Sequence, residues 1–207
     1  MTLEGRPTAA WWSQARLLPL LLVTSAGVQA VAGVVCLLLA TRVRMEGPGD
    51  IPTARMDNSW TLMATATGLV LLITAAVWMA WQRSLARLLW PEGELIRQPS
   101  VQMIAWVIPV VAWWWPLQDI RRSHELLVRR DDSTFTRLTM RWWVCWLVFW
   151  AAQLAAAWIE GSVQSLNGIR AAFTATGIAD LLAIPAALLA SQVVREINRQ
   201  VSESVRP

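Results

Sequence analysis

Asp180 is the residue whose type and position in the sequence most clearly suggest chemistry. It lies seven residues into an apolar run that extends from Phe173 to Val194. A carboxylate inside a membrane is costly, so it usually has a partner or a function. Side chains that could donate a hydrogen bond to it lie in the other apolar runs: Gln29, Thr65, Thr67, Thr74 and Gln153. We predict an intramembrane polar site of Asp180, Gln153 and Gln29, and favour a structural hydrogen bond between helices over a proton or cation site.

The sequence offers little else for catalysis, cofactor binding or metal binding. It contains no phosphate-binding loop, no Gly-rich dinucleotide turn, no HExxH motif and no nucleophile elbow. His124 is the only histidine, so a catalytic triad or a histidine metal site has little to work with. Cys36 and Cys145 lie in apolar runs without Cys/His spacing, which is typical of buried thiols rather than of a disulfide or a metal site. We therefore expect no enzymatic activity, no cofactor and no metal.

Composition indicates an integral membrane protein. The chain has 207 residues, of which 56% are hydrophobic and 15% are charged; a soluble domain carries roughly 25% charged residues. The formal net charge is +4, and all 18 basic residues are arginines. Because these arginines flank apolar runs, we expect anionic lipid headgroups as partners, together with an unidentified protein partner, and no nucleic acid.

Four apolar runs are long enough to cross ~30 Å of hydrocarbon at ~1.5 Å per residue. They are residues 17–40, 60–81, 142–159 and 173–194. We predict an all-α protein with four transmembrane helices in a single membrane bundle over residues 17–194. The first run is long for a signal peptide, so we favour an uncleaved anchor. Small residues at four-residue spacing, such as Ala179 and Ala183, predict close helix contacts inside the bundle.

Other residues mark the expected ends of these spans. Asp57, Asn58 and Ser59 are good N-cap types and predict that the second helix begins there. Tryptophans bracket the spans and predict the headgroup level, where indoles are favoured: Trp11, Trp12, Trp60, Trp78, Trp81, Trp142, Trp143 and Trp158. The i, i+4, i+8 stripe of Trp142, Trp146 and Trp150 could stack a ligand, although we favour a lipid-facing or packing ridge.

Residues 101–130 form a segment of another kind. Residues 101–115 would reach only ~22 Å as a helix, and Pro109 and Pro116 interrupt helical hydrogen bonding. We predict that 101–115 is a wedge that dips into the membrane without crossing it. Residues 117–130 predict an interfacial helix, with one face formed by Leu117, Ile120, His124, Leu127 and Val128.

The charged residues of this interfacial helix predict its surroundings. Its arginines are expected to contact lipid headgroups: Arg121, Arg122, Arg129 and Arg130. His124 is expected at the headgroups too. The i, i+4 spacing predicts surface ion pairs of Glu125 with Arg121 and Arg129, and the acidic pair at 131–132 predicts a solvated helix end.

Arginine counts predict the topology. With four spans, 14 arginines lie on the side of the termini and 4 on the other side, whereas five spans give 12 against 6. The positive-inside rule therefore favours four spans in the cell membrane. Both the N-terminus (residues 1–16) and the tail (residues 195–207) are predicted to be cytoplasmic.

The centre of the chain also resembles a known family. The largely actinobacterial membrane proteins grouped as domain of unknown function 4328 share a Trp, two apolar residues and Pro, followed by Asn-Leu-Trp-Arg-Pro-Tyr-Gln. The matching positions in this chain are Pro99, Trp106, Pro109, Trp114, Pro116 and Gln118, and the departures are Ala112, Trp115 and Leu117. The resemblance extends over roughly residues 15–200; it implies a membrane location and supplies no activity.

These observations indicate a non-enzymatic membrane protein with a structural or regulatory role. A small transporter or channel that uses Asp180 is an alternative, disfavoured because four spans show no internal repeat. A membrane enzyme that acts on lipid is a further alternative, disfavoured because no nucleophile and base are paired in the sequence.

Overall fold

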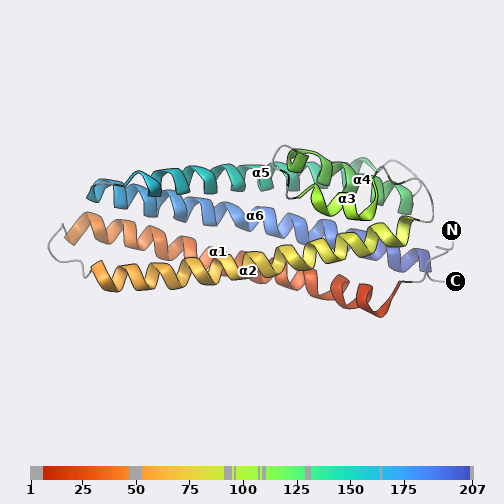
Figure 1. The fold of residues 1–207 in the computed structure, drawn as a ribbon, viewed down its shortest axis with the longest axis horizontal. Helices are drawn as coiled ribbons and strands as arrows, with labels where there is room; N and C mark the ends of the chain where they lie inside the picture. The colour runs from red at the N-terminus through yellow and green to blue at the C-terminus, as the bar shows by residue number, and fades with distance from the viewer. Residues whose placement is uncertain are drawn as a thin grey trace. The chain divides into compact units, whose positions relative to one another are not determined.

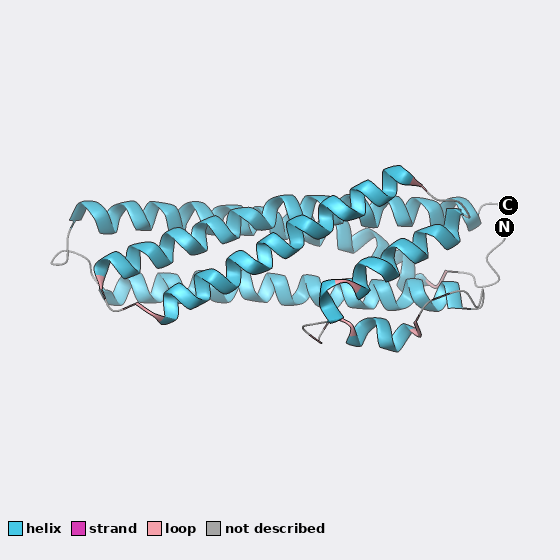
Figure 2. Cartoon of the chain, turned by 90° about the horizontal axis from the view of Figure 1, so that it is seen from above, coloured by secondary structure: helices cyan, strands magenta, loops and turns pink. Residues whose placement is uncertain are grey.

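The computed structural model describes residues 7–46, 53–90, 95, 97–106, 108, 111–128, 132–163 and 165–205, with the side chains of 44–46, 53–60 and 166 left out. Over these residues the chain forms helices and no strand (Figures 1 and 2). The predicted all-α fold class is confirmed.

Four long helices dominate the fold: α1 (Ala9–Glu46), α2 (Thr53–Leu89), α5 (Ser133–Gly161) and α6 (Leu166–Val205). Within the described chain, four helices are long and apolar enough to cross a membrane, as the sequence predicted. At ~1.5 Å per residue they extend about 57, 55, 43 and 60 Å, well beyond the ~30 Å of hydrocarbon. Each helix therefore contains one predicted span and continues past it at both ends.

The predicted start of the second helix is wrong. The helix α2 begins at Thr53, so Asp57, Asn58 and Ser59 lie inside it rather than at its N-cap. N-cap residue types are tolerated within a helix, because their cost there is only a few tenths of a kcal/mol to ~0.7 kcal/mol each.

Between α2 and α5 the described residues form three short elements: α3 (Pro99–Ile104), the 3₁₀ helix η2 (Val111–Trp113) and α4 (Trp115–Val128). The stretch 101–115 is thus not one continuous helix. Pro99 is the first residue of α3 and Pro116 the second residue of α4, and in the first turn of a helix a missing N–H breaks no intrahelical hydrogen bond. With six residues, α3 is too short to cross a membrane. We call residues 97–114 the docked segment.

The chain divides into two compact units. Unit 1 comprises residues 1–22, 73–143 and 189–207, and unit 2 comprises residues 23–72 and 144–188. Unit 1 contains the start of α1, the end of α6, and both α3 and α4 (Figure 1).

The core of unit 1 is a cluster of tryptophans from three long helices and the docked segment. Its members are Trp11, Trp78, Trp81, Trp106, Trp142 and Trp143, linked by ring centroid distances of 5.3 to 6.1 Å. All but Trp106 are at most 7% exposed. The headgroup level expected of Trp11, Trp78, Trp81, Trp142 and Trp143 stays a prediction. Their burial was not predicted: these indoles contact one another inside the protein.

The core of unit 2 depends on small residues. A Cβ added to Gly33 of α1 would lie 2.9 Å from the carbonyl oxygen of Gly177 in α6, and the reverse distance is also 2.9 Å. The backbones of the two helices thus approach as closely as small residues permit. Ala179 and Ala183 are buried on the same helix. Large apolar side chains such as Trp158 (81% exposed) cover the outside of the unit, as expected of a surface that contacts lipid.

Candidate functional site

The docked segment is attached to α2 through one buried amide. The Oε1 atom of Gln82 accepts hydrogen bonds from the indole Nε1 of Trp106 at 2.8 Å and of Trp78 at 3.2 Å. Two donors that converge on one oxygen define the orientation of the amide. In the described part of the chain, Nε2 of Gln82 has no hydrogen-bond partner. The amide of Gln82 therefore binds two tryptophans through its oxygen, and one of them, Trp106, belongs to the docked segment.

A second attachment joins the docked segment to α5. The indole Nε1 of Trp143 donates a hydrogen bond to the backbone carbonyl of Trp113 at 2.8 Å. Trp143 also contacts Trp106 edge to face, with ring centroids 6.1 Å apart. The segment is thus held on two sides by indole groups that the tryptophan cluster already positions.

Arg97 clamps the start of the docked segment to α4. Its guanidinium lies 2.7 Å from Oδ1 of Asp119, donates to Oε1 of Gln118 at 2.9 Å and lies 4.1 Å from the ring centroid of Trp115. The side chain of Asp119 is 1% exposed. Burial raises the pKa of Asp119, while the hydrogen bond and charge of Arg97 oppose that rise. The sequence did not single out Arg97, because a lone arginine in a polar stretch carries no distinguishing signal.

The docked segment exposes several large apolar side chains. They are Ile104 (54%), Ile108 (42%), Trp113 (64%) and Trp114 (44%). The backbone carbonyl of Ile104 accepts a hydrogen bond from the N–H of Ile108, and that of Ile108 accepts one from Ala112. The described part of the segment therefore combines these backbone hydrogen bonds with exposed apolar side chains.

Unit 1 also carries exposed arginines on all four long helices. We call this set the arginine belt: Arg16, Arg83, Arg87, Arg137, Arg141, Arg195 and Arg199. Of these, the described chain offers a carboxylate partner to Arg199 alone. Unit 2 has two arginines with described side chains, Arg42 and Arg170, both exposed. Among the arginines whose side chains are described, those without a carboxylate partner are thus more numerous in unit 1.

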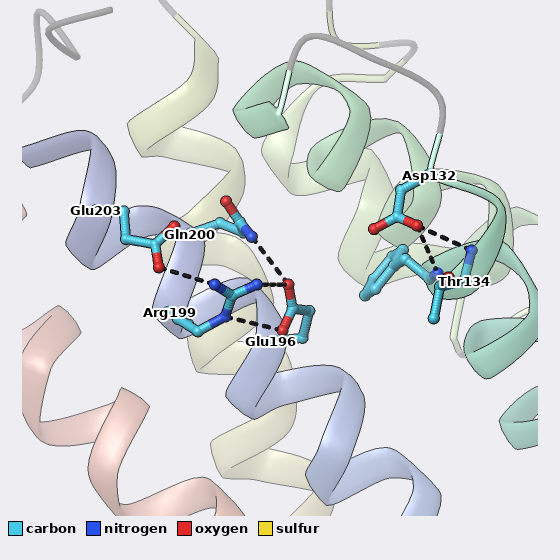
Figure 3. Close-up of polar contacts among 7 residues, drawn as sticks. Asp132, Thr134, Glu196, Arg199, Gln200 and Glu203 are labelled. Atoms are coloured by element: carbon cyan, nitrogen blue, oxygen red, sulfur yellow. Dashed lines mark hydrogen bonds and ion pairs between the residues drawn. The ribbon is translucent and has the colours of Figure 1, made fainter.

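The paired member of the belt lies in a network at the end of α6 (Figure 3). Arg199 bonds to Glu196 and, at 2.8 Å, to Glu203, and Gln200 donates to Oε1 of Glu196 at 2.9 Å. Figure 3 also shows Asp132 at the start of α5, where Oδ1 accepts from the backbone N–H of Thr134 at 2.8 Å. Asp132 is therefore the N-cap of α5, which refines the predicted solvated helix end.

His124 does not contact headgroups, contrary to our prediction. It is 2% exposed and stacks on Phe135 of α5 with ring centroids 3.6 Å apart. Burial lowers the pKa of His124, whereas the charges of Asp132, Glu196 and Glu125 oppose this shift and Arg199 adds to it. The buried face of α4 includes Asp119, Ile120, Ser123 and His124. This face contacts protein, so the apolar pattern of α4 reflects helix packing as well as any lipid contact.

The predicted headgroup arginines are only partly described. Arg121 and Arg122 are half-buried on α4, and Arg129 and Arg130 lie outside the described residues. Glu125 pairs with Arg122 at 3.3 Å, one turn away with i, i+3 spacing. The predicted i, i+4 pair of Glu125 with Arg121 is therefore replaced, since both spacings bring side chains together on a helix.

In unit 2 the structure joins two of the three predicted intramembrane polar residues. Asp180, 7% exposed, accepts a hydrogen bond at its Oδ1 from Nε2 of Gln153 at 3.1 Å. This bond connects α5 with α6. Gln29 is buried in α1, but within the described residues its Oε1 has no hydrogen-bond partner. No group of three or more metal-ligating side chains occurs among the described residues.

Several residues that carried the family resemblance hold the docked segment in place. Pro99 begins α3, Trp106 donates to Gln82, Pro116 is buried at the start of α4, and Gln118 accepts from Arg97. Trp114 belongs to the exposed apolar surface, and Pro109 lies outside the described residues.

Comparison with known proteins agrees with that resemblance. The family model described as Domain of unknown function (DUF4328) matches residues 53–199. No curated protein and no solved structure matches the chain.

Proposed function

The chain belongs to the DUF4328 family, and from that premise we propose that it is a non-enzymatic, multi-pass protein of the cell membrane with a structural or regulatory role. Its partner in this role is anionic lipid, bound by the arginine belt of unit 1. The termini and the docked segment face the cytoplasm.

The observation that carries this proposal is the change from apolar to basic along the exposed faces of the helices. On α1, Arg16 precedes Leu20, which is 63% exposed. On α5, Arg141 precedes Val144, which is 51% exposed. Exposed leucine and valine suit acyl chains, and exposed arginine suits phosphates. Such a boundary along a helix is typical of the headgroup level.

The concentration of arginines in unit 1 supports the orientation. Basic residues near span ends remain on the cytoplasmic side, where anionic lipids attract them by ~1 kcal/mol each. Labelling of single cysteines from outside intact cells tests this orientation. We expect a probe at Pro52 to react and one at Ser133 to be protected; reaction at Ser133 would contradict the proposed topology.

Anionic lipid binding is tested by the melting temperature of the purified protein in detergent, with and without added phosphatidylglycerol. A ligand that binds the folded state raises this temperature. The double variant Arg83→Gln/Arg87→Gln should lose roughly 2 kcal/mol of lipid-dependent stabilisation. The matched control Arg42→Gln/Arg170→Gln removes two exposed arginines from unit 2 and should retain it. Equal losses in both variants would show that the belt is not a specific lipid site.

The carboxylate of Asp180 supports a second candidate, a small transporter or channel. A buried acidic residue within a span is suited to carrying a proton or cation. Its hydrogen bond to Gln153, however, is what a structural link between helices requires, and we rank the structural role first. A flux assay in proteoliposomes with a pH gradient separates the two roles.

A further inference from the structure

The docked segment leaves part of its apolar surface outside the protein core. Ala105 is buried, and Trp106 packs on Trp78 and Trp143. In α3 itself the buried residue is Gln102, a polar side chain, and the three residues of η2 include no buried one. Hydrogen bonds from Trp106 to Gln82 and from Trp143 to the carbonyl of Trp113 also hold the segment. Four large apolar side chains instead face outward: Ile104, Ile108, Trp113 and Trp114. Burial of these four side chains must therefore come from outside the protein.

The attachment points locate this apolar surface along the membrane normal. Gln82 is adjacent in sequence to Arg83, and Trp143 is two residues from Arg141. Both anchors therefore lie within ~3 Å of a belt arginine along their helices. Trp113 and its neighbours are consequently held at the boundary between headgroups and acyl chains, which is where indoles are favoured.

We propose that the docked segment is a lipid-packing sensor: it seats Ile104, Ile108, Trp113 and Trp114 in the leaflet at the arginine belt, and it seats them more fully as that leaflet becomes more loosely packed. The assignment of the leaflet rests on the proposed function of the belt. Apolar side chains enter a leaflet through gaps between headgroups, and such gaps increase with looser packing. Because these four side chains are largely exposed, the depth that they reach follows the packing of the lipid.

Lipid fits this surface better than a protein partner does. Unit 1 also exposes an apolar side chain of a span, Ile73 on α2, which itself suits acyl chains. The exposed arginines beside it lack carboxylate partners in the described chain, which matches the phosphates of lipid headgroups. The backbone hydrogen bonds of Ile108 to Ile104 and of Ala112 to Ile108 also favour entry into an apolar layer.

The test is a polarity-sensitive fluorophore attached at Ile108→Cys. The background is Cys36→Ala/Cys145→Ala, which removes the two free thiols, and Ile104→Cys provides a second attachment site. Val144→Cys and Ser133→Cys are depth references on the exposed face of α5, below and above the belt. The protein is reconstituted in zwitterionic vesicles with either tightly or loosely packed acyl chains. Quenching by lipids that carry nitroxides at different depths measures the position of each label.

We expect the Ile108 label to lie between the two references and its quenching by shallow nitroxides to rise at least twofold in loose bilayers. The Val144 label should not respond. Trp113→Ser/Trp114→Ser should abolish the response, whereas Trp158→Ser, a substitution of a highly exposed tryptophan in unit 2, should retain it. Three results would each overturn the proposal: quenching of the Ile108 label mainly by nitroxides near the bilayer centre, equal quenching in tightly and loosely packed bilayers, or no quenching. Because no anionic lipid is present, these results are independent of lipid binding by the belt.

Discussion

Removal of the hydrogen bond between Gln153 and Asp180 should affect stability in an asymmetric way. In Gln153→Leu, the carboxylate of Asp180 remains 7% exposed and loses its donor. In Asp180→Leu, the orphaned group is the half-buried amide of Gln153, which can turn toward other partners. An unpartnered buried group costs ~1 to 3 kcal/mol, and more when it is charged. We therefore expect Gln153→Leu to be the more destabilising of the two substitutions.

The strength of the bond itself follows from a double-mutant cycle. Hydrogen bonds between membrane helices are worth ~0.6 to 2 kcal/mol. For a chain of this size, that coupling corresponds to a change in melting temperature of about 1 to 8 °C. Asp180→Asn keeps an acceptor oxygen opposite Gln153, so it should melt close to the wild type. The measurement is thermal melting in mild detergent of the wild type, the two leucine variants, their combination and Asp180→Asn. The first four melting temperatures complete the cycle, and the last tests the acceptor.

Two results would refute this reasoning. A coupling energy of zero would show that Gln153 and Asp180 act independently. A well-folded Asp180→Asn protein that loses ion or proton flux in proteoliposomes would show that the charge of Asp180 has a transport role. The structural role predicts instead that Asp180→Asn retains both stability and cellular phenotype.

Three further predictions concern other contacts. Gly33→Ala places a Cβ 2.9 Å from a backbone oxygen and should lower the melting temperature. In Gly27→Ala no atom lies within 4 Å of the new Cβ, so the higher helix propensity of alanine should raise the free energy of unfolding by up to ~1 kcal/mol, and the melting temperature with it. Arg97→Gln should destabilise the protein by about 3 to 5 kcal/mol, because Asp119 then loses its ion pair in a buried position; an unchanged melting temperature would contradict this. Burial lowers the pKa of His124, so the unfolded state binds the proton more readily and stability should fall as pH decreases below ~6.5. His124→Phe, compared with wild type in melts between pH 7 and pH 5, should reduce that fall; an equal pH dependence would contradict the assignment.

The spans could be predicted from sequence, but the ends of the helices could not. Hydrocarbon requires every backbone group to be bonded within the chain, so each long apolar run must be helical. Outside the hydrocarbon that requirement ends, and local helix propensity decides. The helix α2 continues on both sides of its span, from Thr53 to Leu89. The predicted cap at 57–59 failed because polar residues there can join a helix that has already started.

The tryptophan cluster was missed because indole suits two environments. An amphipathic ring is stable at the headgroup level and equally stable in a core that supplies an acceptor for its N–H. Trp78 and Trp158 both stand at a span end, yet one is buried in unit 1 and the other is exposed. Gln82, one turn after Trp78, was a usable signal, because an amide beside an apolar span offers an acceptor to a buried indole.

The pairing of Asp180 with Gln153 was predictable, whereas that of Arg97 with Asp119 was not. The two cases differ in the free energy that each carboxylate would lose without a hydrogen-bond partner. A carboxylate within a span has few polar neighbours to choose from, and its isolation is expensive. Asp119 lies in a segment rich in charge, where an aspartate is normally solvated and needs no partner. Asp119 is buried because the docked segment and α4 pack against each other, and no local sequence pattern predicts that packing. Sequence therefore predicts the contacts whose absence would cost the most free energy. The docked segment is held by hydrogen bonds between groups that could each have been solvated, so its attachment to the protein is visible only in the structure.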